Sequence, residues 1–312
     1  MKTSLSVTLA VAVACMWAQT HAQAPGVPVY TDGQGRRAEA PLIKQAKELK
    51  DAGGLLSMTQ VAEQAKRSVC ELALPKAQSQ QLNGRELWNR SRKAHLRVGW
   101  LFLCKDCNRW HLNLAGGYAI TNSAAATCAH VLDPLDMREG YLIAVDEEER
   151  VLPVAEVLAV NRVLDSAILR LKTGTLQPLP LSTNVAPGDT VSCFSDPMGR
   201  RGFFSQGIVN AFVKKPFLRK RELAALPSPP AADEAPVWVV VSTDWAPGSS
   251  GSAVVDACGN AVGHVSVIEP VLEDPPKNPK LASPPRGTMI VFHDAISASN
   301  LLALIKPPTK HP

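Results

Sequence analysis

The chain has 312 residues, of which 46% are hydrophobic and 20% are charged, and its formal net charge is +5. This composition is that of a folded protein and excludes wholesale disorder. Lysine and arginine are scattered rather than gathered on one segment, which argues against a nucleic-acid-binding protein.

The first residues have the organisation of a secretory signal peptide. Lys2 supplies a positive charge, Leu5–Ala14 form a short apolar run, and a small-residue cleavage site follows, with the cut expected after Ala22. The run is too short to span a membrane. Lipidation of Cys15 is the alternative, but the residues before it fit that poorly. We therefore expect residues 1–22 to be removed and the remainder to be exported, to the periplasm or the medium.

Residues 23–95 are predicted to form a flexible lead, up to about residue 38, and then a helical prefix without chemistry of its own. Ser57 and Gln60 fit a capping box at the start of one of its helices. The helical spacing covers Pro41–Lys50, Ser57–Val69 and Glu86–Lys93.

From Leu96 onward the pattern changes to short β-forming runs separated by turn signals, among them "RVGWLFLC", "SAILRL" and "VWVVVST". With few helices between them, these runs predict an all-β barrel or sandwich. Two proline-rich stretches, "ALPSPPAADEAP" and "EDPPKNPKLASPPRG", interrupt it and predict surface excursions. "KKPFLRKRE", Lys214–Glu222, predicts a solvated loop. "SASNLLALIK" predicts a short closing helix, and residues 307–312 a tail.

One turn in the second half of the chain is rich in serine and glycine. "DWAPGSSGSAVVDACGNAVGHVS" runs from Asp244 to Ser266. A nucleophilic serine in such a turn needs a general base, and the base needs a carboxylate to orient it. The Gly-x-Ser-x-Gly elbow of lipases is excluded, because the fifth residue here is Ser252.

A histidine and an aspartate earlier in the chain suit these two roles. His130 follows a strand and a loop of small residues in "GGYAITNSAAATCAHVLD". Asp165 in "NRVLDSAILRL" begins an apolar run that carries its carboxylate into the interior, where a histidine N–H is a suitable partner. With Ser250, the order along the chain is His, Asp, Ser.

These segments resemble the triad motifs of the chymotrypsin-like serine proteases. "TCAHVL" is similar to T-(A/N)-x-H-V, "LDSAILRL" to D-x-A-(L/V)-L-x-(L/V), and "PGSSGSAV" to G-(D/N/S)-S-G-(G/S)-(P/A). The likeness runs from Leu96 to Lys306 and is closest to the bacterial branch with the HtrA-type and glutamyl-endopeptidase-type enzymes. The resemblance implies two six-stranded antiparallel β-barrels over residues 96–306, here without a following PDZ-type module.

The resemblance also implies roles for individual residues. Ser250 attacks the scissile carbonyl, His130 takes and returns the proton, and Asp165 holds the imidazole in place. The backbone N–H groups of Gly248 and Ser250 form the oxyanion hole. Ser249 stands where trypsin-like zymogens carry an aspartate that pairs with a new N-terminus, so no activation by N-terminal cleavage is expected.

Four further residues are implied to bind substrate: Asp244, Val265, Ser266 and Ile268. Asp244 lies six residues before Ser250, at the spacing of the pocket-floor residue that favours Lys or Arg; the alternative is that it only braces its loop. "HVSVI" is expected to pair with the peptide substrate, with Ser266 next to the triad aspartate and Ile268 narrowing the pocket. His264 is one residue out of register for a role in glutamate specificity.

Six cysteines remain after loss of the signal peptide: Cys70, Cys104, Cys107, Cys128, Cys193 and Cys258. An even number in an exported protein favours disulfides, and six cysteines allow 15 pairings. We expect Cys104 and Cys107 to clamp a hairpin as a disulfide. The alternative is a zinc site with His111, completed by Cys128.

The sequence therefore predicts an exported, monomeric serine endopeptidase of protein or peptide substrates, without cofactor or assigned metal. The alternative is a catalytically silent pseudoprotease that acts as a binding module.

Overall fold

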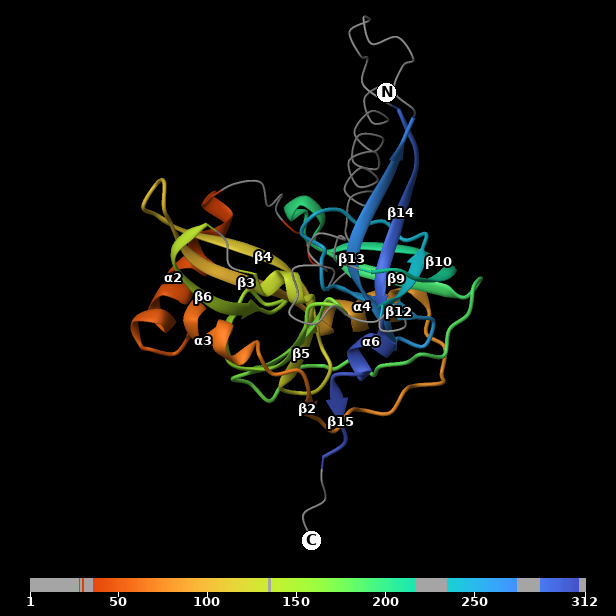
Figure 1. Cartoon of the computed structure of the whole chain (residues 1–312), viewed down its shortest axis with the longest axis horizontal. Coiled ribbons are helices and arrows are strands. Elements are labelled where there is room, and N and C mark those ends of the chain that lie inside the picture. Colours follow the sequence, from red (N-terminus) through yellow and green to blue (C-terminus); the bar gives the residue numbers. More distant parts are fainter. Residues whose placement is uncertain are drawn as a thin grey trace, which may run out of the picture. The chain divides into compact units, whose positions relative to one another are not determined.

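Strands dominate the part of the chain that the structure describes. A computed structural model describes residues 28, 30, 36–133, 136–216, 235–273 and 287–308. The expected signal peptide, most of Lys214–Glu222 and most of both proline-rich stretches lie outside these residues. Within them, the strands close into two six-stranded antiparallel barrels, so the predicted fold class is confirmed (Figure 1).

The first barrel closes where β6 (Met137–Val145) pairs with β7 (Val151–Asn161). The short strand β1 (Leu56–Ser57) also pairs with β6. Along β3, Val98 and Trp100 point into the barrel core, whereas Leu101 points outward. This alternation is the period-two pattern of a strand with two different faces. The barrel strands are β3 (His95–Cys104), β4 (Trp110–Ala119), β5 (Ala124–Thr127), β6 (Met137–Val145), β7 (Val151–Asn161) and β8 (Ser166–Leu171).

The second barrel has the order β10-β11-β14-β13-β12-β9 and returns on itself. Its core is built largely of valines from these strands. The far ends of β13 and β14 extend beyond the barrel as a two-stranded ribbon (Figure 1). The strands are β9 (Thr190–Ser195), β10 (Phe203–Lys214), β11 (Val237–Val241), β12 (Ala253–Asp256), β13 (Ala261–Leu272) and β14 (Thr288–Ser297).

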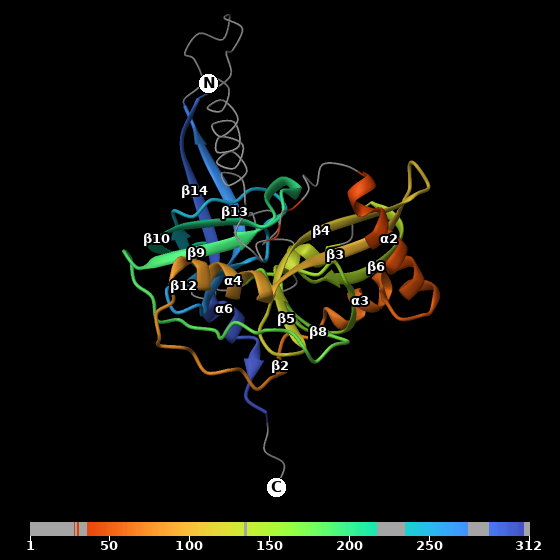
Figure 2. The same ribbon diagram turned by 180° about the vertical axis from the view of Figure 1, so that it is seen from behind.

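The predicted helices are present with altered bounds. α2 (Arg36–Asp51) begins within the expected flexible lead, and it buries Leu42 and Ala46 against the outer face of the first barrel. α3 (Met58–Gln64) carries the predicted Ser57–Gln60 capping box but ends earlier than expected. α4 (Gly84–Ala94) lies beside β9 (Figure 2).

The chain closes differently from the prediction. α6 (Ala298–Leu302) has only five residues and is followed by β15 (Ile305–Lys306), which pairs in parallel with β2 (Cys70–Glu71). Leu301 of α6 packs with alanines of β5 and β12 in a cluster that joins the two barrels. This joint fixes the second barrel against the loop that follows β5. Among the described residues, no helix is long and apolar enough to cross a membrane.

Candidate active site

His130 lies in a short helical turn directly after β5. Its ring Nδ1 is 3.0 and 2.9 Å from the two carboxylate oxygens of Asp165, and its backbone N–H donates to Asp165 Oδ1 at 3.1 Å. The His130 side chain is 32% exposed, whereas that of Asp165 is fully buried. Pairing through Nδ1 directs Nε2 away from the carboxylate.

Asp165 stands in the tight turn between β7 and β8 with a φ of +42°. Three groups hold it besides the His130 ring: the backbone N–H of His130, the Ser266 hydroxyl, which donates to Oδ2 at 2.5 Å, and His264 Nε2, 3.1 Å from the Asp165 carbonyl oxygen. Asp165 is thus held from both barrels, since β13 supplies Ser266 and His264.

Burial and pairing oppose each other in the pKa values of this pair. Burial raises the pKa of Asp165. The hydrogen bonds and charge of His130 and the hydrogen bond from Ser266 lower it by more, so the pKa lies below its ordinary value. Burial lowers the pKa of His130, while the bond to Asp165 and its charge raise it, to above the ordinary value. Asp165 is therefore ionised at neutral pH.

The turn that carries Ser250 is built from two positive-φ glycines. Gly248 has a φ of +98° and Gly251 a φ of +85°. A Cβ on Gly251 would lie 2.4 Å from both the Gly116 carbonyl and the Thr127 hydroxyl and 3.1 Å from the backbone nitrogen of Cys128. Only glycine fits there, and the close approach sets the turn against the segment that leads to His130.

Backbone hydrogen bonds fix the same turn from both sides. The Gly116 N–H of β4 donates to the Ser250 carbonyl at 2.7 Å, and the Gly251 N–H donates to the Val265 carbonyl at 2.7 Å. Within the described residues, the N–H groups of Gly248 and Ser250 donate to no protein acceptor. Two such donors beside a nucleophile suit a developing oxyanion.

The four residues expected to bind substrate are not equivalent in the structure. Asp244 is exposed and lines a cavity of about 870 Å³ with residues of β10, β11 and β14. Ser266 is held by Asp165, and Ile268 is 38% exposed on β13. Val265 is buried in the second core, and its backbone N–H and carbonyl both bond to the nucleophile turn. Its backbone thus holds that turn against β13.

Two residues that precede Ser250 in the same loop, Trp245 and Ser249, are buried. Ser249 is fully buried, and its hydroxyl donates to the Ser195 hydroxyl at 3.1 Å, which replaces the ion pair expected of a zymogen. Trp245 is buried with its indole N–H bonded to the Val267 carbonyl, and its ring meets His293 edge-on at 5.0 Å. His264 is directed at Asp165 and away from the surface.

A second histidine–aspartate pair lies nearby. Arg92, Lys93 and Arg97 lie close to His95 in the sequence, yet His95 is 7% exposed and its Nε2 lies 3.2 Å from Asp196 Oδ2. The adjoining Ser195 is fully buried. No substrate carbonyl can reach a serine at this depth, so this arrangement lacks an accessible nucleophile.

The prediction of disulfides is wrong in this structure. All six cysteines of the described chain are free thiols, including Cys104 and Cys107. Cys128 neither bridges nor joins those two; its buried thiol donates to the Val265 carbonyl at 3.1 Å, and burial raises its pKa well above the ordinary value. It therefore stays protonated and ties the His130 loop to β13, although it lies close to His130 and Asp165.

Sequence reasoning missed several contacts that assemble this site. The Gly116 bond to Ser250, the His264 contact with Asp165 and the His95–Asp196 pair all join residues far apart in the chain. The glycine pair in "LAGGYAI" was the one available signal, because adjacent glycines in a strand indicate close backbone approach.

The region that holds His130, Asp165 and Ser250 matches a known protein family. Residues 116–263 match the trypsin-like peptidase domain, a span that begins in β4, ends in β13 and includes His130, Asp165 and Ser250. Residues 116–263 are therefore similar to trypsin-like peptidase domains. No curated protein sequence matches it.

Solved structures similar to the chain include serine proteases. The serine endoprotease from Yersinia pestis is 17% identical with a TM-score of 0.45, over 71% of this chain and 64% of that one. The HtrA-type protease AlgW with a decapeptide is 17% identical with a TM-score of 0.49, over 72% of this chain and 66% of that one. AlgW with a tripeptide gives 17% and 0.48, over 70% and 60%. The chain thus spans less than two-thirds of the length of these proteins.

Proposed function

We propose that this peptidase domain is a serine endopeptidase in which Ser250 is the nucleophile, His130 the general base and Asp165 the orienting carboxylate. One observation carries the proposal. A buried aspartate holds a partly exposed histidine through Nδ1 at 2.9 Å, directly beside the glycine turn that presents Ser250. A base that is fixed on one edge and accessible on the other is what proton transfer from a hydroxyl requires.

The reaction follows from these positions. His130 Nε2 accepts the Ser250 proton as the oxygen attacks the carbonyl, and Asp165 stabilises the imidazolium that forms. The Gly248 and Ser250 N–H groups bind the oxyanion, each worth about 3 kcal/mol. His130 then protonates the leaving amine, and water releases the acyl group by the same steps in reverse order.

An unpaired edge of β13 supports a peptide as substrate. Up to Val265, β13 is bonded to β12 and the nucleophile turn, but among the described residues it pairs only with β14 beyond that point. Apart from the Val267 carbonyl, which accepts from the Trp245 indole, its backbone groups from Ser266 onward therefore offer an edge to an extended chain. A peptide laid along this edge passes next to the Ser250 turn.

Asp244 supports a preference for basic side chains. Three carboxylates line its cavity, but Lys215 bonds to Glu269 at 2.8 Å and to Asp294 at 2.6 Å, which leaves Asp244 without an ion pair in the described chain. We expect Asp244→Asn to reduce cleavage after Lys and Arg relative to other residues. A cleavage profile of a peptide library that does not change with this substitution would rule out the preference.

We also propose export of the protein, with loss of residues 1–22. The support is the sequence of the N-terminus alone, since those residues lie outside the described part of the chain. Mass spectrometry of the protein recovered from the periplasm or medium tests it, because cleavage after Ala22 leaves a chain that begins at Gln23.

Labelling with a fluorophosphonate probe tests the proposed activity directly, since the probe reacts with activated serines whatever the substrate preference. The full chain should be labelled once, and Ser250→Ala should remove the label. Ser195→Ala is the matched control, because Ser195 adjoins the buried His95–Asp196 pair, and it should retain the label. A folded wild-type chain that resists labelling would instead indicate the pseudoprotease.

A further inference from the structure

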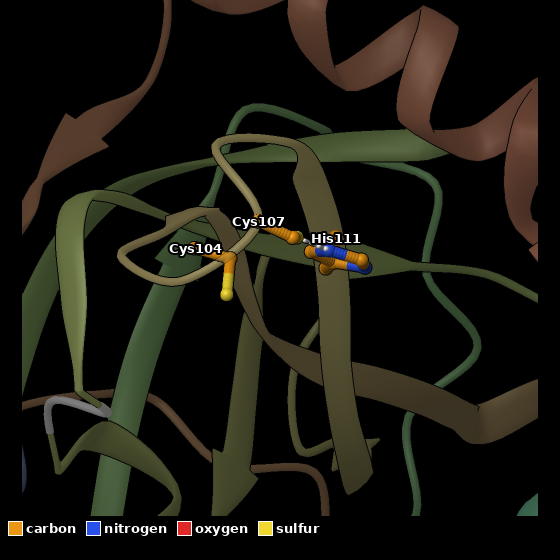
Figure 3. Close-up of side chains that lie close together, drawn as sticks. All are labelled: Cys104, Cys107 and His111. Atoms are coloured by element: carbon orange, nitrogen blue, oxygen red, sulfur yellow. Dashed lines mark hydrogen bonds between the residues drawn. The ribbon is translucent and has the colours of Figure 1, made fainter.

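Two cysteines and a histidine meet at the tip of the β3–β4 hairpin. Cys104 ends β3, Cys107 lies in the loop, and His111 is the second residue of β4. Their ligand atoms all lie within 4.8 Å of one another, and Cys107 Sγ is 3.0 Å from His111 Nε2 (Figure 3). The expected disulfide does not explain this cluster, because both cysteines are free thiols.

Contacts outside the cluster hold the loop in this conformation. The Cys104 N–H donates to the Arg109 carbonyl at 3.0 Å, and the Asn108 N–H donates to the Cys104 carbonyl at 3.2 Å. From β6, the Arg138 guanidinium donates to the Asn108 side chain at 2.9 Å and to the Lys105 carbonyl at 3.3 Å. The Phe102 ring lies against His111 at 5.6 Å. The three side chains therefore converge without a disulfide between the two cysteines.

We propose that Cys104 Sγ, Cys107 Sγ and His111 Nε2 bind one Zn²⁺ ion, with water in the fourth position. Two thiolates and an imidazole form a donor set that favours zinc over the hard cations Ca²⁺ and Mg²⁺. Donors around one tetrahedral zinc lie about 3.5–3.8 Å apart, given zinc–sulfur and zinc–nitrogen distances near 2.3 and 2.0 Å. A small opening of the Cys107–His111 contact reaches that geometry.

The charge state of the cluster also suits a metal. The hydrogen bond with His111 is the main cause that lowers the pKa of Cys107, to about 6. A thiolate is the form that ligates zinc, and the contact with His111 Nε2 at 3.0 Å favours that form at Cys107. Thiols that ligate zinc lose their protons on binding.

The cluster is separate from the proposed active site. His111 stands five residues before Gly116, the β4 residue that bonds to Ser250. At about 3.4 Å per strand residue, the two positions are about 17 Å apart. Substitutions at the tip therefore leave the catalytic groups in place, and metal binding can be measured independently of proteolysis.

Titration of the reduced, metal-free full chain with Zn²⁺ and with Co²⁺ tests the proposal. We expect one ion per chain, with the sulfur-to-cobalt charge-transfer absorption and strong visible bands of tetrahedral Co²⁺. Cys104→Ser and Cys107→Ser should each abolish the charge-transfer band or reduce affinity by more than the about 10–100-fold that outer-sphere changes cost. His111→Gln should weaken binding by a similar factor while part of the sulfur absorption remains. Cys258→Ser is the matched control and should bind as the wild type does.

Each other outcome overturns the site. Binding that survives Cys107→Ser, or that disappears in Cys258→Ser, would place the metal elsewhere. A folded wild-type chain without uptake of either ion would exclude the site, and fluorophosphonate labelling shows that such a chain is folded if Ser250 is active, with circular dichroism as the measure otherwise. Peptide mapping that finds a Cys104–Cys107 disulfide in chain that takes up no metal after reduction would assign the pair to redox chemistry.

Discussion

The two histidine–aspartate pairs of this protein contain the same groups in different surroundings. His130 pairs through Nδ1 and remains 32% exposed, whereas His95 pairs through Nε2 and is 7% exposed, packed edge-on against Phe194. The His95 Nδ1 is buried and has no hydrogen-bond partner among the described residues. A histidine–aspartate hydrogen bond alone therefore does not make a catalytic pair. The histidine must also present its second nitrogen to a reacting group.

The buried pair has a structural position instead. Asp196 accepts from the Gly202 N–H at 2.8 Å, and the Met198 N–H two residues later donates to the Pro247 carbonyl at 2.7 Å, next to Gly248. His95 begins the first strand of the first barrel. The His95–Asp196 pair thus links the first barrel to the segment that supports the nucleophile turn.

Exchange of each aspartate for asparagine gives the largest expected difference between the two pairs. Asp165→Asn should reduce kcat about 10⁴-fold, because the imidazole loses its correct tautomer and the charge that stabilises it. Asp196→Asn should instead lower the free energy of unfolding by about 1–3 kcal/mol, because the buried contact of Asp196 Oδ2 with His95 Nε2 is lost. Rates of fluorophosphonate labelling and urea unfolding curves, measured on both variants, separate the effects.

The outcome that contradicts this distinction is specific. If Asp196→Asn slowed labelling as much as Asp165→Asn and left the unfolding curve unchanged, the catalytic pair would be His95 with Asp196.

Much of this arrangement could be predicted from the sequence because its signals are local. Alternating strands separated by turn residues predict the barrels, and the motifs around His130, Asp165 and Ser250 each lie within a few residues. β5, by contrast, is Ala124–Thr127, a run that lacks strong strand formers. It is a strand because only small side chains fit between the barrels, which is a tertiary cause.

The His95–Asp196 contact and the free thiols could not be predicted from the sequence for the same reason. Charged residues flank His95 in the sequence, and no residue near it indicates a contact with Asp196, which lies 101 positions later. The cysteine count suggested disulfides, but Cys128 and Cys193 are buried in different cores and each packs as a small apolar side chain. Pairing depends on distances between elements, which composition does not contain.

Gly248 lies between the Ser250 turn and the segment that contains Asp196, and its substitution is expected to have the second-largest effect. A Cβ there would lie 3.1 Å from the Asp196 carbonyl at a φ of +98°, so Gly248→Ala should turn its N–H away from the oxyanion. Loss of one such donor lowers kcat about 10²–10³-fold. Gly188→Ala is the matched control, because its φ is +96° and no atom lies within 4 Å of its added Cβ. We expect both variants to lose similar stability, but only Gly248→Ala to lose activity. Equal activities of the two variants would show that Gly248 is not part of the oxyanion hole.

The pH dependence of labelling and of stability gives a further test of the His130–Asp165 pair. The pKa of His130 is raised, so the neutral base is lost below that value, and labelling should fall about tenfold per pH unit there. The sign for stability is opposite. A raised folded-state pKa stabilises the protein fully below the unfolded value of about 6.5 and loses that contribution as the pH rises through the folded pKa. Labelling should therefore rise over the range in which this contribution to the free energy of unfolding declines.

Two variants check the assignment of that profile. Asp165→Asn should move the midpoint of labelling to lower pH, because the charge and bond that raise the His130 pKa are removed. Asp196→Asn, where it folds, should leave the midpoint in place. A midpoint that follows Asp196 would assign the titration to the buried pair.

The smallest effect is expected at Ser266. Its hydroxyl donates to Asp165 Oδ2 at 2.5 Å, a bond to a charged acceptor of about 1.5–3 kcal/mol. Ser266→Ala leaves Asp165 ionised and still bonded to both the ring and the backbone N–H of His130, so only part of that energy is lost in the transition state. We expect kcat to fall about tenfold, which corresponds to about 1.4 kcal/mol, with KM nearly unchanged. Ser195→Ala, at the buried pair, should change kcat less than about twofold. Steady-state kinetics on a peptide that the wild type cleaves distinguishes the two, and a larger loss in Ser195→Ala than in Ser266→Ala would mean that the catalytic aspartate has been assigned to the wrong pair.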